Sequence, residues 1–399
     1  MTAPGELTHT AVPDPVCGPD EIVLRTEAVS ICSTDVSYFR GHLTPEAWPI
    51  VPGHEYVGRV VEVGQRLAGD VATGDRIAYW GQTDFDGMAE YRLLRPLFAG
   101  RLNVETSWYT RRNFYDSDQA AAVVLPADVP PDLASMVEPL TSVLRSLLLN
   151  PCRPGDVCVV LGCGPSALLA VQVLNAHMGA GSVTVLDRSD PRLATALGHG
   201  ASAAFNTDTQ AAELGAFVHE HHDQYADFVF DALPHIDAPE TTTGKDIREL
   251  AMGLLRPGGT YVIYGATSVP QRINTWLILA KGLQLRSTPF DVRLFPMSRS
   301  ANVMNVALRL IRSGLVDARP LVTDRVALSD AGNVQRVFLD YGSGPSMKTS
   351  MLAPEILRQC QKRLLEATNL PTTAPAPVTV GNGRPDKEAG LRASVNGRG

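Results

Sequence analysis

Short apolar runs separated by Gly and Pro dominate the first third of the chain. Four of them, residues 21–29, 56–64, 75–81 and 88–94, have the length and the flanking turn residues of β-strands. Runs of this kind, repeated along the chain, predict a β-rich domain over residues 1–150.

The spacing of apolar residues changes in the second third of the chain. Residues 156–162 and 182–187 have the pattern of buried strands, and residues 165–179 between them have helical spacing. Similar units follow and include a predicted helix over residues 245–259. Because alternating strands and helices form parallel sheets with crossover helices, the pattern predicts an α/β domain over residues 151–290.

The rest of the chain divides into a structured part and a tail. An amphipathic helix is predicted over residues 301–315, and a strand followed by a helix over residues 321–340. We expect residues 291–352 to return to the first domain and complete it. Residues 367–399 are rich in Pro, Thr, Ala and Gly with little apolar surface to bury, and we predict a mostly disordered C-terminal tail over residues 353–399.

Composition excludes several classes of protein. The chain has 35 Lys and Arg residues against 42 Asp and Glu residues, a net charge of −7, and no basic run, so nucleic acid is not an expected partner. No apolar stretch reaches about 18 residues, so no membrane interaction is expected. The N-terminus lacks the basic and apolar regions of a secretory signal, which predicts a cytoplasmic protein. The six cysteines are too scattered for a disulfide framework and are expected to be reduced.

A glycine-rich turn separates the strand pattern at residues 156–162 from the helix pattern that follows. Gly162 allows a tight turn, Gly164 lets the backbone approach a pyrophosphate, and Ala167 replaces the third glycine where helix and strand pack closely. Pro165 and Ser166 complete the turn, and free N–H groups at a helix N-terminus favour phosphate. The motif predicts a doubly wound Rossmann sheet that binds a dinucleotide, and the alternative is an ordinary glycine turn of an α/β protein.

Asp187 ends the next apolar strand, twenty positions after Ala167. A carboxylate at this place accepts hydrogen bonds from the ribose hydroxyls and would repel a 2′-phosphate, which favours NAD over NADP. Arg188, next to Asp187, leaves room for NADP. Arg192 lies either over the adenine or on a solvated helix face, and the sequence does not decide between them.

Cys32, His54 and Glu138 are candidate ligands of a metal. Thiolate, imidazole and carboxylate are ligands of zinc, and catalytic zinc sites leave one position open. Spacing alone does not show that the three residues converge. Each also has a structural interpretation: Cys32 as core filler, His54 as a hydrogen-bonded loop residue, and Glu138 as an acid that the helix dipole favours.

A series of motifs resembles a known family. The series is CSTD at residues 32–35, PGHEYVGRVVEVG at 52–64, GDRIA at 74–78, DGMAEY at 86–91, EPL at 138–140 and GCGPSA at 162–167. In this order, over about residues 20–352, the series is similar to the zinc-dependent medium-chain dehydrogenase/reductase family, which includes alcohol and polyol dehydrogenases. The resemblance implies a GroES-like catalytic domain and a Rossmann domain, with the active site in the cleft between them.

The resemblance also implies the metal site and the assembly. One catalytic zinc is expected on Cys32, His54 and Glu138, with Glu55 as an intermittent fourth ligand. Members of the family are usually dimers or tetramers, so a homodimer or homotetramer is expected.

Two further residues receive roles from the resemblance. Asp35 is expected to orient the metal-binding imidazole. Thr34 is expected to take the proton of the substrate hydroxyl and to pass it toward the nicotinamide ribose.

The chain departs from many members of the family. No cysteine lies between Cys32 and Cys152, so the four-cysteine structural zinc lobe is missing, and residues 97–118 form an extra segment. These features, with a carboxylate ligand at Glu138, resemble polyol, threonine and cyclitol dehydrogenases, such as 2-deoxy-scyllo-inosamine dehydrogenases. We therefore expect a small polar substrate, a secondary alcohol of a polyol, sugar, cyclitol or amino alcohol, oxidised to a ketone in secondary metabolism.

Two other functions remain open from the sequence. One is a zinc-free, NAD(P)H-dependent reductase of the same superfamily, against which the candidate metal ligands and Asp187 argue. The other is a catalytically silent NAD-binding protein whose tail recruits a partner.

Overall fold

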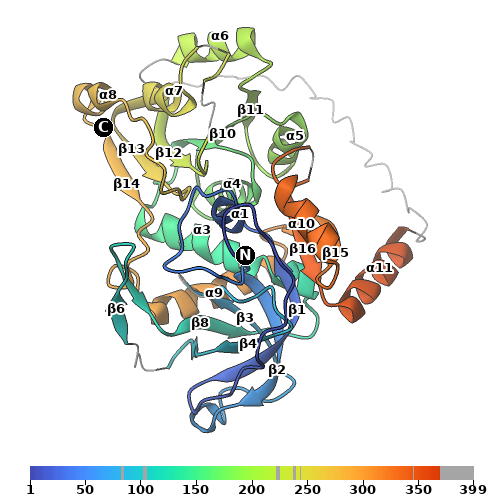
Figure 1. Ribbon diagram of the computed structural model, residues 1–399. Helices are drawn as coiled ribbons and strands as arrows, with labels where there is room; N and C mark the ends of the chain where they lie inside the picture. The colour runs from blue at the N-terminus through green and yellow to red at the C-terminus, as the bar shows by residue number, and fades with distance from the viewer. Residues whose placement is uncertain are drawn as a thin grey trace, which may run out of the picture. The chain divides into compact units, whose positions relative to one another are not determined.

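The computed structural model describes residues 1–81, 85–101, 106–221, 225–236, 240–242, 244–344 and 346–368. Two large sheets contain most of the strands (Figure 1). The first has the order β15-β16-β1-β2-β3-β8-β5, with β4 paired to β1. Its strands are β1 (Ile22–Ser30), β2 (Glu55–Val63), β3 (Arg76–Trp80), β4 (Tyr91–Leu94), β5 (Pro96–Phe98), β8 (Ala120–Val124), β15 (Val322–Ala327) and β16 (Lys348–Leu352).

The second sheet is parallel and six-stranded. Its order is β11-β10-β9-β12-β13-β14, which is 3-2-1-4-5-6 along the chain, the order of a dinucleotide-binding doubly wound sheet. Its strands are β9 (Val157–Leu161), β10 (Ser182–Asp187), β11 (Ala203–Asn206), β12 (Ala226–Asp231), β13 (Leu255–Ile263) and β14 (Gln284–Ser287). The predicted α/β fold with a doubly wound parallel sheet is therefore confirmed.

Helices connect and cover these strands. They are α1 (Ser33–Phe39), α2 (Pro131–Ala134), α3 (Val137–Leu149), α4 (Pro165–Ala176), α5 (Asp190–Gly198), α6 (Ala211–His221), α7 (Ile247–Leu254), α8 (Thr275–Lys281), α9 (Met297–Arg312), α10 (Ala331–Leu339) and α11 (Pro354–Thr368), with single 3₁₀ turns at Gln65–Leu67 and Arg319–Leu321. In the second sheet, helices α4, α5 and α7 each contact the strand that precedes them and the strand that follows them in the sequence, as crossover helices do.

Each sheet has its own hydrophobic core. In the first sheet, Leu24 of β1, Tyr56 of β2 and Ile77 of β3 are fully buried in one cluster. In the second sheet, Leu161 of β9 and Val229 of β12 are buried in a separate cluster. Helix α3 contacts β2 and β3 of the first sheet and also α4 of the second region, so it links the two.

The helix predicted over residues 245–259 is too long. Helix α7 ends at Leu254, and β13 begins at Leu255. Pro257 lacks the N–H that a helix interior needs, and Gly258 has φ of +75°, in the left-handed region. These two residues exclude a continuous helix and leave the chain extended.

Two predicted segments have more structure than expected. Within the extra segment, residues 97–118, strands β6 (Ser107–Tyr109) and β7 (Tyr115–Ser117) form an antiparallel pair. The tail predicted over residues 353–399 begins with helix α11, so its first part is not disordered, and the predicted disorder of residues 369–399 lies outside the described residues. No described helix is long and apolar enough to cross a membrane.

Candidate active site

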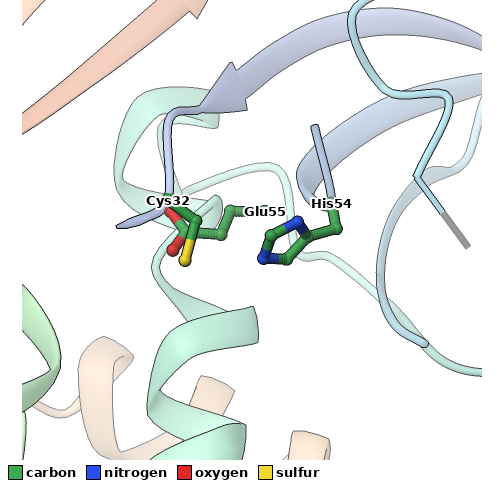
Figure 2. Close-up of side chains that lie close together, drawn as sticks. All are labelled: Cys32, His54 and Glu55. Atoms are coloured by element: carbon green, nitrogen blue, oxygen red, sulfur yellow. The ribbon is translucent and has the colours of Figure 1, made fainter. Parts of the chain in front are cut away.

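The pairing of β1 and β2 brings the first candidate ligands together. The two strands run antiparallel, so Ser30 at the end of β1 lies opposite Glu55 at the start of β2. Cys32 and His54 lie just beyond these paired ends. The ligand atoms of Cys32, His54 and Glu55 all lie within 4.8 Å of one another (Figure 2).

Asp35 forms an ion pair with the His54 imidazole. Its carboxylate is fully buried and accepts backbone N–H groups from Cys32 and Gly53, each at 2.9 Å. Asp35 Oδ1 lies 3.6 Å from His54 Nδ1, a buried nitrogen that makes no hydrogen bond to any described residue. Burial opposes the charge of Asp35, but the His54 ring and the two N–H groups hold its pKa below the usual value. The arrangement leaves His54 Nε2 as the nitrogen for a metal.

Glu55 is held by a lysine from a distant strand. Lys348 of β16 donates to both carboxylate oxygens of Glu55, each at 2.6 Å, and to Ile31 O at 3.1 Å. All three groups are buried. Burial opposes the charge on Lys348, but the Glu55 carboxylate outweighs it and raises the Lys348 pKa. A carboxylate already neutralised in this way is a weaker candidate for permanent metal binding.

Glu138 lies beside the compact cluster of Cys32, His54 and Glu55 but is not part of it. It is in the first turn of α3 and 6% exposed, and Ser142 Oγ donates to it at 3.3 Å. Burial raises its pKa to about 7, against the opposing charge of His54. No ion pair within 4.0 Å joins Glu138 to a cation in the part of the chain that the structure describes, so a divalent metal would supply the close positive charge that this buried carboxylate needs. The donor set of Cys32, His54 and Glu138 therefore fits zinc, with Glu55 close enough to join it.

Thr34 lies beside the candidate metal ligands. It is in the first turn of α1, its Oγ1 accepts a hydrogen bond from the Cys32 thiol at 3.6 Å, and it lines the cleft.

The glycine turn has the shape that a pyrophosphate requires. Gly162 has φ of +90°, and a Cβ there would lie 3.0 Å from the Leu233 side chain. Gly164 precedes Pro165, the first residue of α4, and a Cβ there would meet nothing within 4 Å, so open space lies over the helix N-terminus. Ala167 is buried against the sheet. The first N–H groups of a helix have no acceptor within it, so the N-terminus of α4 can bind an anion.

Asp187 also stabilises this turn. It ends β10, and its two carboxylate oxygens accept N–H groups from Cys163 at 2.7 Å and Ser189 at 2.8 Å. An ionised carboxylate has about four acceptor positions, so two remain for ribose hydroxyls. Arg192 of α5 donates to Ser346 O at 2.5 Å, so it is not simply a solvated helix residue.

One cleft of about 1590 Å³ joins the two groups of residues. Its lining includes the predicted residues Cys32, Thr34, His54, Glu55, Glu138, Gly162, Gly164, Pro165, Ser166, Ala167, Asp187 and Arg192, and also Arg188. Asp35 lies behind the lining and is buried.

Lys348, Trp80 and Arg145 are among the residues of this cleft that sequence reasoning missed. Lys348 is 293 positions from Glu55, and only the sheet pairing brings them together. Trp80, whose Nε1 donates to Ser142 Oγ at 2.7 Å, and Arg145 of α3 line the cleft as well. Arg145 follows Glu138 by seven residues, so helical periodicity from Glu138 was the one signal for it.

Comparisons with known proteins identify the domains. Residues 18–98 match the family described as alcohol dehydrogenase GroES-like domain, and residues 167–293 match the family described as zinc-binding dehydrogenase. The sorbitol dehydrogenase of Halalkalibacterium halodurans is 28% identical over 335 residues, which cover 81% of this chain and 90% of that protein. The L-threonine 3-dehydrogenase of Bacillus velezensis is 26% identical over 351 residues, which cover 81% of this chain and 89% of that protein.

A solved structure supports the same fold. Galactitol-1-phosphate dehydrogenase from Escherichia coli superimposes with a TM-score of 0.66 at 21% identity, covering 88% of this chain and 98% of that chain. This similarity concerns the fold alone, but it agrees with the two domain matches. The resemblance found in the sequence is confirmed: the chain belongs to the zinc-dependent medium-chain dehydrogenase/reductase family and is an oxidoreductase of the alcohol dehydrogenase type.

Proposed function

We propose that the protein oxidises a secondary alcohol of a polyol or amino alcohol to a ketone, with one catalytic zinc and NAD. One observation carries the proposal: a sulfur, nitrogen and carboxylate donor set lines the same cleft as a dinucleotide-type glycine turn. The relatives named for sorbitol and threonine support a substrate with neighbouring hydroxyl or amino groups. A cyclitol remains a prediction from the sequence.

Cys32, His54 and Glu138 would hold the zinc, and Glu55 would join them intermittently. A bound zinc would act as a Lewis acid that stabilises negative charge on the substrate oxygen, and NAD would accept the hydride. Asp35 keeps the His54 ring in place through its fixed carboxylate.

Thr34 moves the proton in this proposal. Its Oγ1, which lies next to the Cys32 thiol, accepts the proton of the substrate hydroxyl and passes it toward the nicotinamide ribose. Trp80 and Phe85 also line the cleft.

Asp187 supports NAD rather than NADP. Its remaining acceptor positions suit two ribose hydroxyls, whereas a 2′-phosphate would be repelled. Arg188 and Arg192 line the cleft beside it, so we expect measurable but weaker use of NADP. A comparison of kcat/KM with the two cofactors tests this, and equal values would contradict the preference.

We further propose a homo-oligomer that acts in the cytoplasm on a small-molecule substrate. Exposed apolar residues, Trp276 and Leu279 of α8 and Leu285 of β14, support the assembly.

Elemental analysis of protein purified without added metal tests the zinc site. We expect about one zinc per chain in the wild type and loss of it in Glu138→Ala. The matched control is Glu62→Ala, which removes an exposed carboxylate of β2 and should retain the metal. NAD-linked oxidation is then measured on sorbitol, xylitol, threonine, myo-inositol and ethanol.

Three results would overturn the proposal in whole or in part. Zinc near zero together with NADPH-dependent reduction of activated C=C bonds would indicate the zinc-free reductase. NAD binding without turnover of any substrate would indicate the silent binding protein. Activity confined to ethanol would overturn the polyol assignment.

A further inference from the structure

Arg145 is a buried cation that the proposed chemistry does not use. It is 2% exposed, on α3, seven residues after Glu138 and three after Ser142. Residues at these spacings share one helix face. All three line the cleft, so Arg145 belongs to the same wall as the candidate metal ligand.

The guanidinium group of Arg145 is packed between aromatic rings. Its Cζ lies 3.8 Å from the centroid of the Trp80 ring and 4.7 Å from that of Phe295. Nε and Nη2 are buried and make no hydrogen bond to any residue in the described part of the chain. Burial lowers the pKa of Arg145 to about 9, although Glu138 opposes this. Donors buried without acceptors are costly, so an acceptor from outside the chain would stabilise them.

The two unpartnered nitrogens form one edge of the guanidinium, with parallel N–H groups. Two other arginines of this chain show what that edge binds. Arg293 donates from Nε and Nη2 to the two carboxylate oxygens of Asp291 at 2.8 and 2.6 Å. Arg319 does the same with Asp317 at 2.8 and 2.9 Å. The free edge of Arg145 therefore matches a group with two negatively charged oxygens.

The cleft carries charges of both signs, and its acidic lining residues are Glu46, Glu55, Glu138, Asp187 and Asp190. No ion pair within 4.0 Å joins Arg145 to a carboxylate among the described residues, although Glu138 and Asp116 act on it from farther away. Arg111 and Arg112 line the same cleft. A nicotinamide carboxamide has one acceptor oxygen and an NH₂ donor, which does not match two parallel donors.

We propose that Arg145 determines substrate specificity by binding a carboxylate or phosphate group of the substrate, remote from the hydroxyl that is oxidised. This inference rests on the polyol dehydrogenase activity proposed above and narrows it to anionic polyols, such as sugar acids or polyol phosphate monoesters. The rise along α3 from Glu138 to Arg145 is about 10 Å, and helix side chains lean toward the N-terminus, which shortens the span. A five- or six-carbon chain suits that distance.

Calorimetric titration of the NADH-bound holoenzyme tests the binding directly, because NADH cannot accept a hydride from the probe. The probes are sorbitol, gluconate and sorbitol 6-phosphate. We expect one of the two anions to bind the wild type at least about tenfold more tightly than sorbitol, as a charge-assisted pair of hydrogen bonds would give. Tighter binding of gluconate would identify a carboxylate substrate, and tighter binding of sorbitol 6-phosphate a phosphate monoester.

Two variants connect this preference to Arg145. Arg145→Met fills a similar volume without charge, and we expect it to abolish the preference for the anion in both affinity and kcat/KM. Arg145→Lys keeps the charge but lacks the two-donor edge, so it should retain only part of the preference. If Arg145→Met does not fold, Arg145→Lys alone tests whether the two-donor edge gives the preference for the anion. The control is Arg309→Gln, which changes an exposed arginine of α9 and should retain the full preference.

The outcomes separate this inference from the proposed function. If the wild type oxidises sorbitol and binds it as tightly as both anions, the anion subsite is wrong and the polyol activity stands. If Arg145→Met or Arg145→Lys keeps the full preference, another residue binds the anion, and the role of Arg145 is overturned. If the wild type contains no zinc and oxidises none of the probes, the proposed function and this inference both fail.

Discussion

The Glu55 side chain has a buried positive partner, and this pairing decides how it can serve a metal. Lys348 occupies both of its oxygens, whereas Glu138 has one hydroxyl donor. Glu55 belongs to the compact donor cluster, but its pairing with Lys348 supports the proposal that Glu138 is the permanent ligand.

Removal of the lysine should leave a buried carboxylate without a cation. We expect Lys348→Met to lower the free energy of unfolding by about 3–5 kcal/mol, measured by chemical unfolding. The double variant Glu55→Gln/Lys348→Met should recover much of this loss, because no charge is then left unpaired. Lys362→Met, at an 80% exposed side chain, is the control and should change little. Equal stability of the wild type and Lys348→Met would show that the pair contributes nothing.

The Thr34 hydroxyl has a role that a small substitution can isolate. Thr34→Ala should reduce turnover roughly 100-fold with the Kd of NAD unchanged, because it removes a proton acceptor and no cofactor contact. Thr34→Ser keeps the hydroxyl and should retain most of the activity. Stopped-flow measurement of NADH formation and a separate NAD titration give the two quantities. Wild-type turnover in Thr34→Ala would contradict the relay.

Sequence reasoning found those site residues whose neighbours in the chain carry a pattern. Asp187 ends a predicted strand, whereas Cys32 and His54 were found through motifs that resemble the family. Lys348 escaped because its partner is 293 positions away. Arg145 escaped because the absence of a hydrogen-bond partner is a property of packing, which a sequence does not show.

Among the elements, the β6–β7 pair of the extra segment is tied to the chain that leads into α9. Tyr115 N donates to Asp291 Oδ2 at 3.2 Å, and Val292 N donates to Tyr115 O at 3.0 Å. Arg293 Cζ lies 4.0 Å from the centroid of the Tyr115 ring. These contacts hold the segment that carries Arg112, whose Nη1 donates to the Tyr38 hydroxyl at 3.1 Å.

Asp291→Ala should therefore loosen this pair of strands. We expect amide hydrogen exchange over residues 107–117 to become faster, because the variant removes an acceptor of Tyr115 N and the partner of Arg293. Asp317→Ala is a matched control, since Asp317 binds Arg319 in the same two-residue spacing away from the extra segment. Faster exchange in both variants would indicate a general loss of stability instead.

Strands and helices were predicted best where the apolar period was regular. The strand predicted over residues 156–162 is β9, and the helix predicted over residues 165–179 contains α4. The boundary at Leu254 and Leu255 was missed because both leucines continue the helical spacing of α7. Pro257 and Gly258 were the local signals against that helix.

At the scale of the whole molecule, β14 is an edge strand. It pairs with β13 alone among the described strands, and all four of its residues are exposed. Next to it in sequence, α8 has Trp276 at 68% and Leu279 at 76% exposure. An exposed strand edge with apolar residues nearby favours pairing with a second copy.

We therefore expect Trp276→Glu combined with Leu285→Arg to shift the protein toward the monomer. Sedimentation velocity should show a homo-oligomer for the wild type and a lower mass for the double variant. Leu315→Glu, which changes another exposed leucine, should leave the mass unchanged. A wild-type protein that sediments as a monomer would contradict the proposed assembly.

The place of β16 beside β1 has a consequence for synthesis on the ribosome. The last part of β1 leads directly to Cys32, and its outer edge is covered by β16, with Ser30 opposite Ser350 and Ile31 N bound to Thr349 O at 3.0 Å. The nascent chain therefore exposes this edge until about residue 350 has left the exit tunnel. Contacts so distant in sequence form late. The Rossmann sheet, whose strands are all translated earlier, can fold first, and a prematurely terminated chain would lack both the covering strand and Lys348. We therefore expect metal to bind only after β16 has been synthesised.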